Sequence, residues 1–167
     1  MYDAPRSSAE GATVKFETIL VPTDYSESSK HALHYAIGFS KKFGSRLRLL
    51  HVVQDLPVLS STAYEGLDLA LYQERLREDA KRQMDQLVQE TPDLHDARLH
   101  QTLRSGVPYL EIIEEARECK VDLIITATHG RSGLTHFLMG SVAEKIVRNS
   151  PCPVLTVKTP EFAFQSA

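Results

Sequence analysis

Two short segments of the chain carry residue types that could contact a ligand. The first is Thr23-Asp24, directly after an apolar run, and the second runs from Ala127 to Ser141 and contains Gly130, Gly133 and Gly140. Glycine lets backbone N–H groups approach an anion without a Cβ in the way. A helical pattern starts near Ser141, directly after Gly140, and a helix start presents free N–H groups and the positive end of the helix dipole. The second segment therefore predicts a phosphate cradle split across one loop.

Each part of this cradle also has a purely structural interpretation. A Gly-Ser pair before a helix is usually a cap, so Ser141 could cap its own helix or donate its hydroxyl to a phosphate oxygen. A glycine-rich loop is usually a turn. The segment is not a P-loop, because no G-K-[ST] occurs, and it lacks the dinucleotide motif G-x-G-x-x-G. The spacing alone leaves both interpretations open.

Side chains with catalytic potential are present, but their spacing shows no catalytic constellation. His129 lies in the glycine-rich loop, and Arg131 could reach a γ-phosphate or face solvent. Asp24 could act as a base, although contact with a ribose needs only a hydrogen-bond acceptor. The other histidines are scattered and expected on the surface or on helix faces: His31, His34, His51 and His136. We predict no catalytic residue and a protein that is not an enzyme.

The elements that must position these residues alternate regularly along the chain. Apolar runs of strand length occur at Thr18–Pro22, Leu47–Val53, Ala97–Leu103, Val121–Ala127 and Val154–Val157. Helical patterns separate them, and this alternation predicts a single doubly wound α/β domain with a parallel sheet and helices on both faces. In such a sheet ligands bind beyond the carboxyl ends of the strands, where the strand order reverses. Both candidate segments directly follow a predicted strand.

The helical patterns carry recognisable start and stop signals. The first can begin at Ser26 or Ser28 as a cap, and Gly44 supplies its stop. The second covers roughly residues 64–90. The third opens with Pro108, whose fixed φ suits a first helical turn.

Composition describes an ordinary globular protein. The 167 residues are 42% hydrophobic and 25% charged, with a net charge of −3. This balance predicts no nucleic-acid partner, and no apolar stretch approaches a membrane span, so we expect a cytoplasmic protein. Cys119 and Cys152 lack metal-ligand or redox spacing and are expected as unpaired, partly buried residues. We expect a loose arm at residues 1–14, the domain at 15–158 and a tail at 159–167.

One long segment favours the phosphate-binding interpretation over the purely structural one. The sequence ATHGRSGLTHFLMGSVAEKIVRNSPCPVLTVK resembles the C-terminal signature of the universal stress protein family, whose nucleotide-binding members show G-x2-G-x9-G-[ST]. This frame falls on Ala127, Gly130, Gly140 and Ser141, with alanine in place of the first glycine. Three earlier segments also resemble this family in their order and spacing: ILVPTDYSESSKHAL, LLHVV and SGVPYLEIIEEA. The resemblance covers about residues 16–158.

The resemblance implies a five-stranded sheet of order 3-2-1-4-5 and an ATP site. The implied site residues are Pro22, Thr23, Asp24, Leu47, Ala127, Thr128, Gly130, Arg131, Gly140, Ser141 and Val142. Asp24 would hydrogen-bond the ribose and Leu47 would press on the adenine. The glycines and the start of the last helix would hold phosphates bridged by Mg²⁺ or Mn²⁺. The alanine should cost little if its φ is negative, and should weaken binding if its φ is positive or its methyl group touches the ligand.

The same resemblance points to a homodimer. Val154–Val157 would lie at a sheet edge, whose unpaired N–H and C=O groups favour pairing with a second copy near Leu155–Thr156. The predicted function is thus an ATP-binding stress or regulatory module. The alternatives are an interaction module of the same fold without a working nucleotide site, and a weak ATPase.

Overall fold

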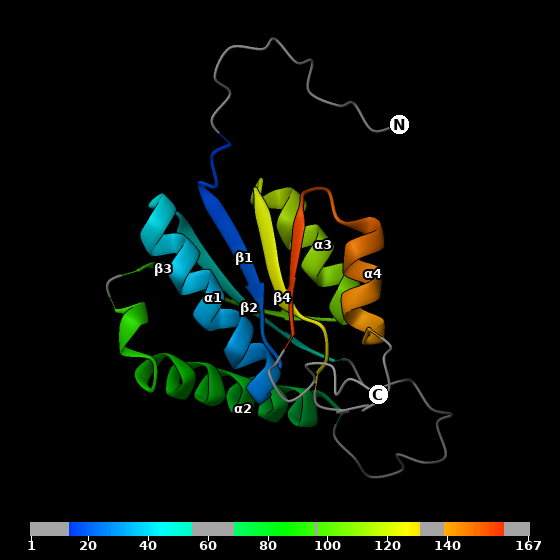
Figure 1. Ribbon diagram of the computed structural model, residues 1–167. Helices are drawn as coiled ribbons and strands as arrows, with labels where there is room; N and C mark the ends of the chain where they lie inside the picture. The colour runs from blue at the N-terminus through cyan, green and yellow to red at the C-terminus, as the bar shows by residue number, and fades with distance from the viewer. Residues whose placement is uncertain (1–13, 55–68, 96, 131–138, 159–167) are drawn as a thin grey trace, which may run out of the picture.

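The structure, a computed structural model, describes residues 14–54, 69–95, 97–130 and 139–158 (Figure 1). Its elements follow in the order β1 (Thr18–Pro22), α1 (Glu27–Phe43), β2 (Arg46–Val53), α2 (Leu69–Gln89), η2 (Pro92–Leu94), β3 (Arg98–Ser105), α3 (Pro108–Glu118), β4 (Leu123–Ala127), α4 (Ser141–Asn149) and β5 (Val154–Val157). Residues 1–13 of the expected arm and the whole expected tail lie outside the described residues.

The five strands form one parallel sheet in the order β3-β2-β1-β4-β5, which confirms the predicted order. The order reverses between β1 and β4, which pair through Ile19 and Leu123. The segments that follow these two strands therefore leave the sheet side by side.

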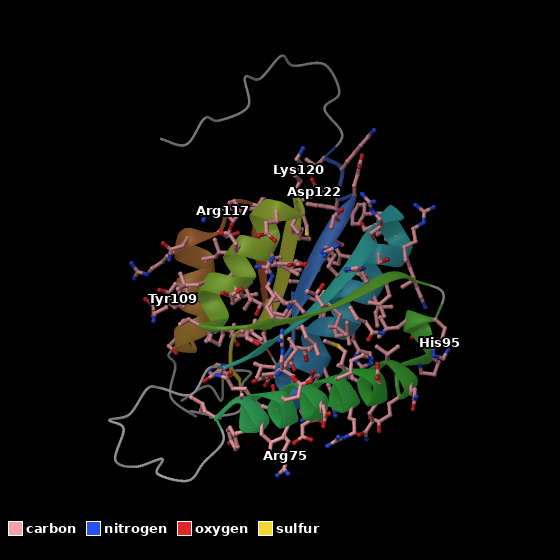
Figure 2. All side chains as sticks on the ribbon, turned by 180° about the vertical axis from the view of Figure 1, so that it is seen from behind. Arg75, His95, Tyr109, Arg117, Lys120 and Asp122 are labelled. Atoms are coloured by element: carbon pink, nitrogen blue, oxygen red, sulfur yellow. The ribbon has the colours of Figure 1, made fainter. Side chains whose placement is uncertain are left out.

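Helices cover both faces of the sheet, with α1 and α2 on one face and α3 and α4 on the other (Figures 1 and 2). Ile19 and Ile125 belong to the core under α1, whereas Leu20 and Ile124 belong to the core under α3 and α4. Because both faces are buried, the central strands are apolar at consecutive positions.

The predicted helix signals are found in place. Ser26 is the N-cap of α1 and its side chain accepts a hydrogen bond from the Ser29 N–H, while Gly44 ends this helix with a left-handed φ of 71°. Pro108 opens α3. The predicted second helix agrees with α2 from Leu69 onward, and its first five residues lie outside the described part. No helix in the described ranges is long and apolar enough to cross a membrane.

Two strands begin later than predicted. β3 starts at Arg98 and runs to Ser105, because it pairs with β2 along its whole length, from Arg46 to Val53. β4 starts at Leu123, because Asp122 turns its carboxylate to the start of β1 and accepts hydrogen bonds of 2.9 Å from the N–H groups of Glu17 and Thr18.

A buried ion cluster joins α3 to β2 and β3; we call it the Glu115 cluster. The Glu115 side chain is only 3% exposed and accepts hydrogen bonds from Arg48 at 2.6 Å and Arg104 at 2.8 Å. Thr102 donates to the same carboxylate. Burial by itself would raise the pKa of Glu115, but the hydrogen bonds from the two arginines outweigh it and hold this pKa below its usual value.

Cys119 and Cys152 are both free and partly buried, as predicted. They pack at the border of the core under α3 and α4. Burial raises the pKa of both thiols, which keeps them protonated near neutral pH.

Candidate functional site

A cavity of about 630 Å³ opens at the carboxyl ends of the central strands. Its walls come from the segments after β1 and β4, the end of β2, the first turns of α3 and α4, and α2, which crosses this end of the sheet (Figure 1). The predicted residues that line it are Pro22, Thr23, Asp24, Ala127, Thr128, Gly130, Gly140, Ser141 and Val142. The fold thus brings the two candidate segments to one cavity.

Among the predicted residues that the structure describes, Leu47 does not line this cavity. Leu47 is fully buried near the start of β2, in register with Ile19, and packs in the core under α1. The expectation that Leu47 contacts a ligand here is therefore corrected, and the apolar β2 residues that do line the cavity are Val52 and Val53. Arg131 lies outside the described residues.

The Asp24 carboxylate is oriented by the cap of α1. Its Oδ1 accepts hydrogen bonds from the Ser26 N–H at 3.1 Å and from the Ser26 hydroxyl at 2.5 Å. Ser26 Oγ in turn accepts from the Ser29 N–H at 3.3 Å. The helix cap therefore fixes the direction of a side chain that opens into the cavity.

Gly130 lies close to the second oxygen of the same carboxylate. A Cβ on Gly130 would be 2.8 Å from Asp24 Oδ2, shorter than real contacts of this kind. Gly130 does not have a positive φ, since the positive-φ glycines of the described residues are Gly44 and Gly106. The glycine is needed here for the close approach of two loops and not for an unusual backbone conformation.

The start of α4 has the geometry of the predicted cradle. Gly140 is the N-cap, with φ −56° and ψ 144°, and its N–H donates to the Thr128 carbonyl at 2.8 Å. Ser141 is the first residue of the helix, so it does not cap its own helix, and its exposed side chain lines the cavity. The N–H groups of the first turn have no partners within the helix and carry the positive end of its dipole.

Ala127, where the signature has glycine, is the last residue of β4. The positive-φ residues other than glycine in the described ranges are Tyr25 and Lys120, so Ala127 has ordinary strand geometry. Its side chain is 8% exposed and its methyl group is accommodated without backbone strain.

Sequence reasoning missed the contacts between Tyr25, His51 and α2. His51 was expected at the surface or on a helix face, but it lies on β2, and its Nδ1 donates to the Thr23 carbonyl at 2.8 Å, since a carbonyl can only accept. The ring of His51 stacks on Tyr25 with centroids 4.3 Å apart, and the Tyr25 hydroxyl donates to the Ala80 carbonyl of α2 at 2.8 Å. The rule that placed Asp24 after β1 could have placed His51 near the end of β2.

The described residues of the cavity offer polar and apolar groups at separate places. Within the described ranges, no group of three or more His, Cys, Asp or Glu side chains could hold a metal ion. One wall offers N–H groups and hydroxyls for an anion, Asp24 offers a carboxylate for hydroxyl donors, and the end of β2 offers apolar surface.

Known proteins are similar to this chain along most of its length. Residues 15–158 match the universal stress protein family. The chain is 36% identical over 146 residues to universal stress protein MJ0531 of Methanocaldococcus jannaschii, covering 87% of this chain and 84% of that protein.

Solved structures share the fold. The structure of protein MJ0577 from the same organism is 31% identical, with a TM-score of 0.73, and the match covers 87% of this chain and 98% of that one. A universal stress protein from Archaeoglobus fulgidus, solved in complex with dAMP, has a TM-score of 0.61 at 15% identity, with 87% and 100% covered. The chain belongs to the universal stress protein family.

Proposed function

We propose that this protein binds an adenine nucleotide, ATP, in the cavity at the carboxyl ends of the strands and acts as a regulatory module in a stress response. The observation that carries the proposal is that the first turn of α4 and the Asp24 carboxylate open into the same cavity. An anion-binding helix start and an acceptor for ribose hydroxyls are the two polar features that a nucleotide needs.

The roles follow from the positions of the residues. The N–H groups of Ser141 and Val142, with the Ser141 hydroxyl, hold phosphate oxygens, and Gly130 and Gly140 leave room for backbone to approach them. Asp24 accepts from the ribose. A bound Mg²⁺ or Mn²⁺ would be held mainly by the phosphate oxygens and would neutralise their charge.

The base is assigned to the apolar end of β2. Val52 and Val53 are buried and line the cavity, so they take the role first expected of Leu47. Apolar contacts offer little to the exocyclic groups of guanine, so ATP should bind more tightly than GTP. The cavity volume lies within the range of small-molecule sites, about 300–1,000 Å³.

The dAMP complex of the Archaeoglobus fulgidus protein supports the choice of an adenine nucleotide. The alternative is an interaction module whose cavity takes no nucleotide. Nucleotide extraction from the purified protein, followed by calorimetry with ATP and GTP, separates the two. Recovered adenine nucleotide and tighter binding of ATP support the proposal, and an empty protein that binds neither nucleotide contradicts it. Steady release of phosphate from bound ATP would assign a weak ATPase instead.

We further propose that the protein is a homodimer joined through β5. This strand pairs only with β4 among the described strands, and its residues Val154, Leu155 and Thr156 are partly exposed. An edge of this kind can pair antiparallel with its copy about a two-fold axis.

Thr156→Lys tests the dimer, because it places like charges near the two-fold axis. Val157 is unsuitable, since its side chain is buried in the core. We expect light scattering to show dimers for the wild type and monomers for Thr156→Lys at micromolar concentration. Lys158→Gln, just beyond the strand, is the control and should stay dimeric. A monomeric wild type contradicts the proposal.

A further inference from the structure

A second cavity, of about 470 Å³, lies at the opposite end of the sheet, where the strands begin. The segment before β1, the last turn of α1 and the first residues of β2 and β3 enclose it. Figure 1 shows the starts of β1 and β2 toward the top of the view, on the other side of the sheet's centre from α2. The two cavities share no lining residue.

Positive charge gathers around this second cavity, although the chain as a whole is negative. Lys15, Lys42, Arg46 and Arg98 line it, and Glu17 is the one carboxylate among its described lining residues. None of the four cationic groups forms an ion pair with another described residue, and the Lys42 ammonium has only a ring contact, 6.0 Å from the Phe43 centroid. A cation at Lys42 is favoured by the end of α1, but that reason does not extend to the other three.

The two arginines are direct partners in the pairing of β2 with β3. Side chains of residues paired in register extend to the same face of the sheet, on strands about 4.8 Å apart. Two like charges at such paired positions repel each other. The same two strands carry Arg48 and Arg104, which share the buried carboxylate of Glu115. No described carboxylate lies between Arg46 and Arg98 to neutralise them in the same way. Two adjacent guanidinium groups can instead bind a phosphate, each through a pair of N–H groups.

Two aromatic residues line the second cavity together with these cationic residues. Phe16 and Phe43 meet edge to face with centroids 5.4 Å apart, and Phe43 is 46% exposed. The exposed Phe43 ring and the four cations, which form no ion pair within the described ranges, line the same cavity, so they offer a flat apolar surface and charge to one ligand.

We propose that this second cavity is a binding site for a small organic phosphate that carries a flat apolar group. Arg46 and Arg98 hold the phosphate, Lys15 and Lys42 add attraction, and Phe43 packs against the apolar group. The site does not depend on the cavity at the carboxyl ends of the strands.

Phenyl phosphate is a suitable probe, titrated by calorimetry into the full chain. We expect binding that weakens as salt is added, and a loss of about tenfold or more in affinity in Arg46→Gln/Arg98→Gln, because charge-assisted hydrogen bonds are removed. Both side chains are exposed, so folding should survive. If this variant does not fold, Lys15→Gln/Lys42→Gln takes its place and should weaken binding several-fold, because two attracting charges are removed.

Two control variants locate the probe. Arg75→Gln/Arg77→Gln removes the same charge from the exposed side of α2, where Figure 2 shows Arg75 pointing away from the sheet, and should leave binding unchanged. Gly140→Val alters the other cavity and should also leave it unchanged. An equal loss of affinity for phenyl phosphate in the α2 variant would show unspecific charge attraction. A loss in Gly140→Val alone would place the probe in the other cavity. Either result overturns the proposal, and so does the absence of binding at millimolar phenyl phosphate.

The aromatic part is tested separately. The wild type should bind phenyl phosphate more tightly than inorganic phosphate, and Phe43→Ser should reduce this preference without weakening inorganic phosphate. Equal affinity of the wild type for both probes would overturn the assignment of a flat apolar group.

Discussion

The Glu115 cluster and the cavity at the carboxyl ends of the strands both gather polar groups against the same sheet, but they use them in opposite ways. In the Glu115 cluster each carboxylate oxygen faces an arginine from β2 or β3, and the group is closed. In the cavity, Asp24 Oδ1 is held by Ser26, while the N–H groups at the start of α4 face open space.

The difference separates stability from binding. A buried carboxylate between two arginines contributes to stability mainly because it compensates their buried charges. Removing it should therefore lower the free energy of unfolding. Polar groups fixed by a cap and by glycines around a cavity contribute little to folding, so altering them should affect the ligand. Variants in the two regions should therefore change different measurements.

The largest effect on stability is expected for Glu115→Gln. It leaves Arg48 without an ion-pair partner among the described residues, whereas Arg104 keeps its pairs with Glu111 and Glu118. Breaking a buried pair destabilises by about 3–5 kcal/mol. Denaturant unfolding measures this loss, and ATP affinity of the folded variant should be unchanged. Glu114→Gln is the matched control: its carboxylate lies at the surface, 3.7 Å from Arg117, and should contribute at most about 1 kcal/mol. Equal losses in both variants would contradict the assigned role.

This effect should depend on pH. Because folding lowers the pKa of Glu115 from 4.5, its stabilisation is present above about pH 4.5 and is lost as the pH falls through the lower folded value. The difference in unfolding free energy between the wild type and Glu115→Gln should shrink in acid. A difference that stays constant from neutral pH to pH well below 4.5 would contradict it.

Gly140→Val should have the largest effect on binding. Its Cβ would be 3.2 Å from the Thr128 carbonyl oxygen, and its branches would occupy the approach to the helix start. We expect no ATP binding by calorimetry and a stability change of only about 1 kcal/mol. Gly38→Ala is the control glycine, since a Cβ there meets nothing within 4 Å, and it should bind ATP normally. Normal binding by Gly140→Val would place the phosphates elsewhere.

Gly130→Ala should have an intermediate effect. The new methyl group displaces Asp24 Oδ2, so ATP affinity should fall by roughly tenfold, about 1.4 kcal/mol. In an Asp24→Ala background the same change should have no further effect, because the displaced group is absent. Additive losses in the double variant would show that Gly130 acts independently of Asp24.

Ala127→Gly should have the smallest effect. The backbone at this position suits alanine, so ATP affinity should stay within about twofold of the wild type, a difference under about 0.5 kcal/mol. A several-fold rise on calorimetry would show that the methyl group obstructs the ligand.

Much of this molecule could be predicted from local patterns. Ser26, Gly44 and Pro108 are signals that act within a few residues, and the alternation of strands with helices determines which loops meet at the carboxyl end. That rule singled out Asp24, Gly130 and Gly140, and the structure places all three around one cavity.

The rest depends on contacts that local patterns do not carry. Leu47 was assigned by resemblance, and only the register of β2 against β1 shows that it lies too far from the strand end. Arg48 and Glu115 are 67 residues apart, and no spacing in the sequence predicts their pairing. His51 was misjudged because its partner is a backbone carbonyl, which has no sequence signature.

Tyr25 adds a consequence for the thermodynamics of binding. It has a φ of 65°, unusual for a bulky residue, and it is held there by its stacking on His51 and its hydrogen bond to Ala80. The loop next to Asp24 is thereby fixed before any ligand arrives. The entropic penalty of ordering this loop falls on folding and not on association, so a ligand that reaches Asp24 loses less free energy to the immobilisation of its site.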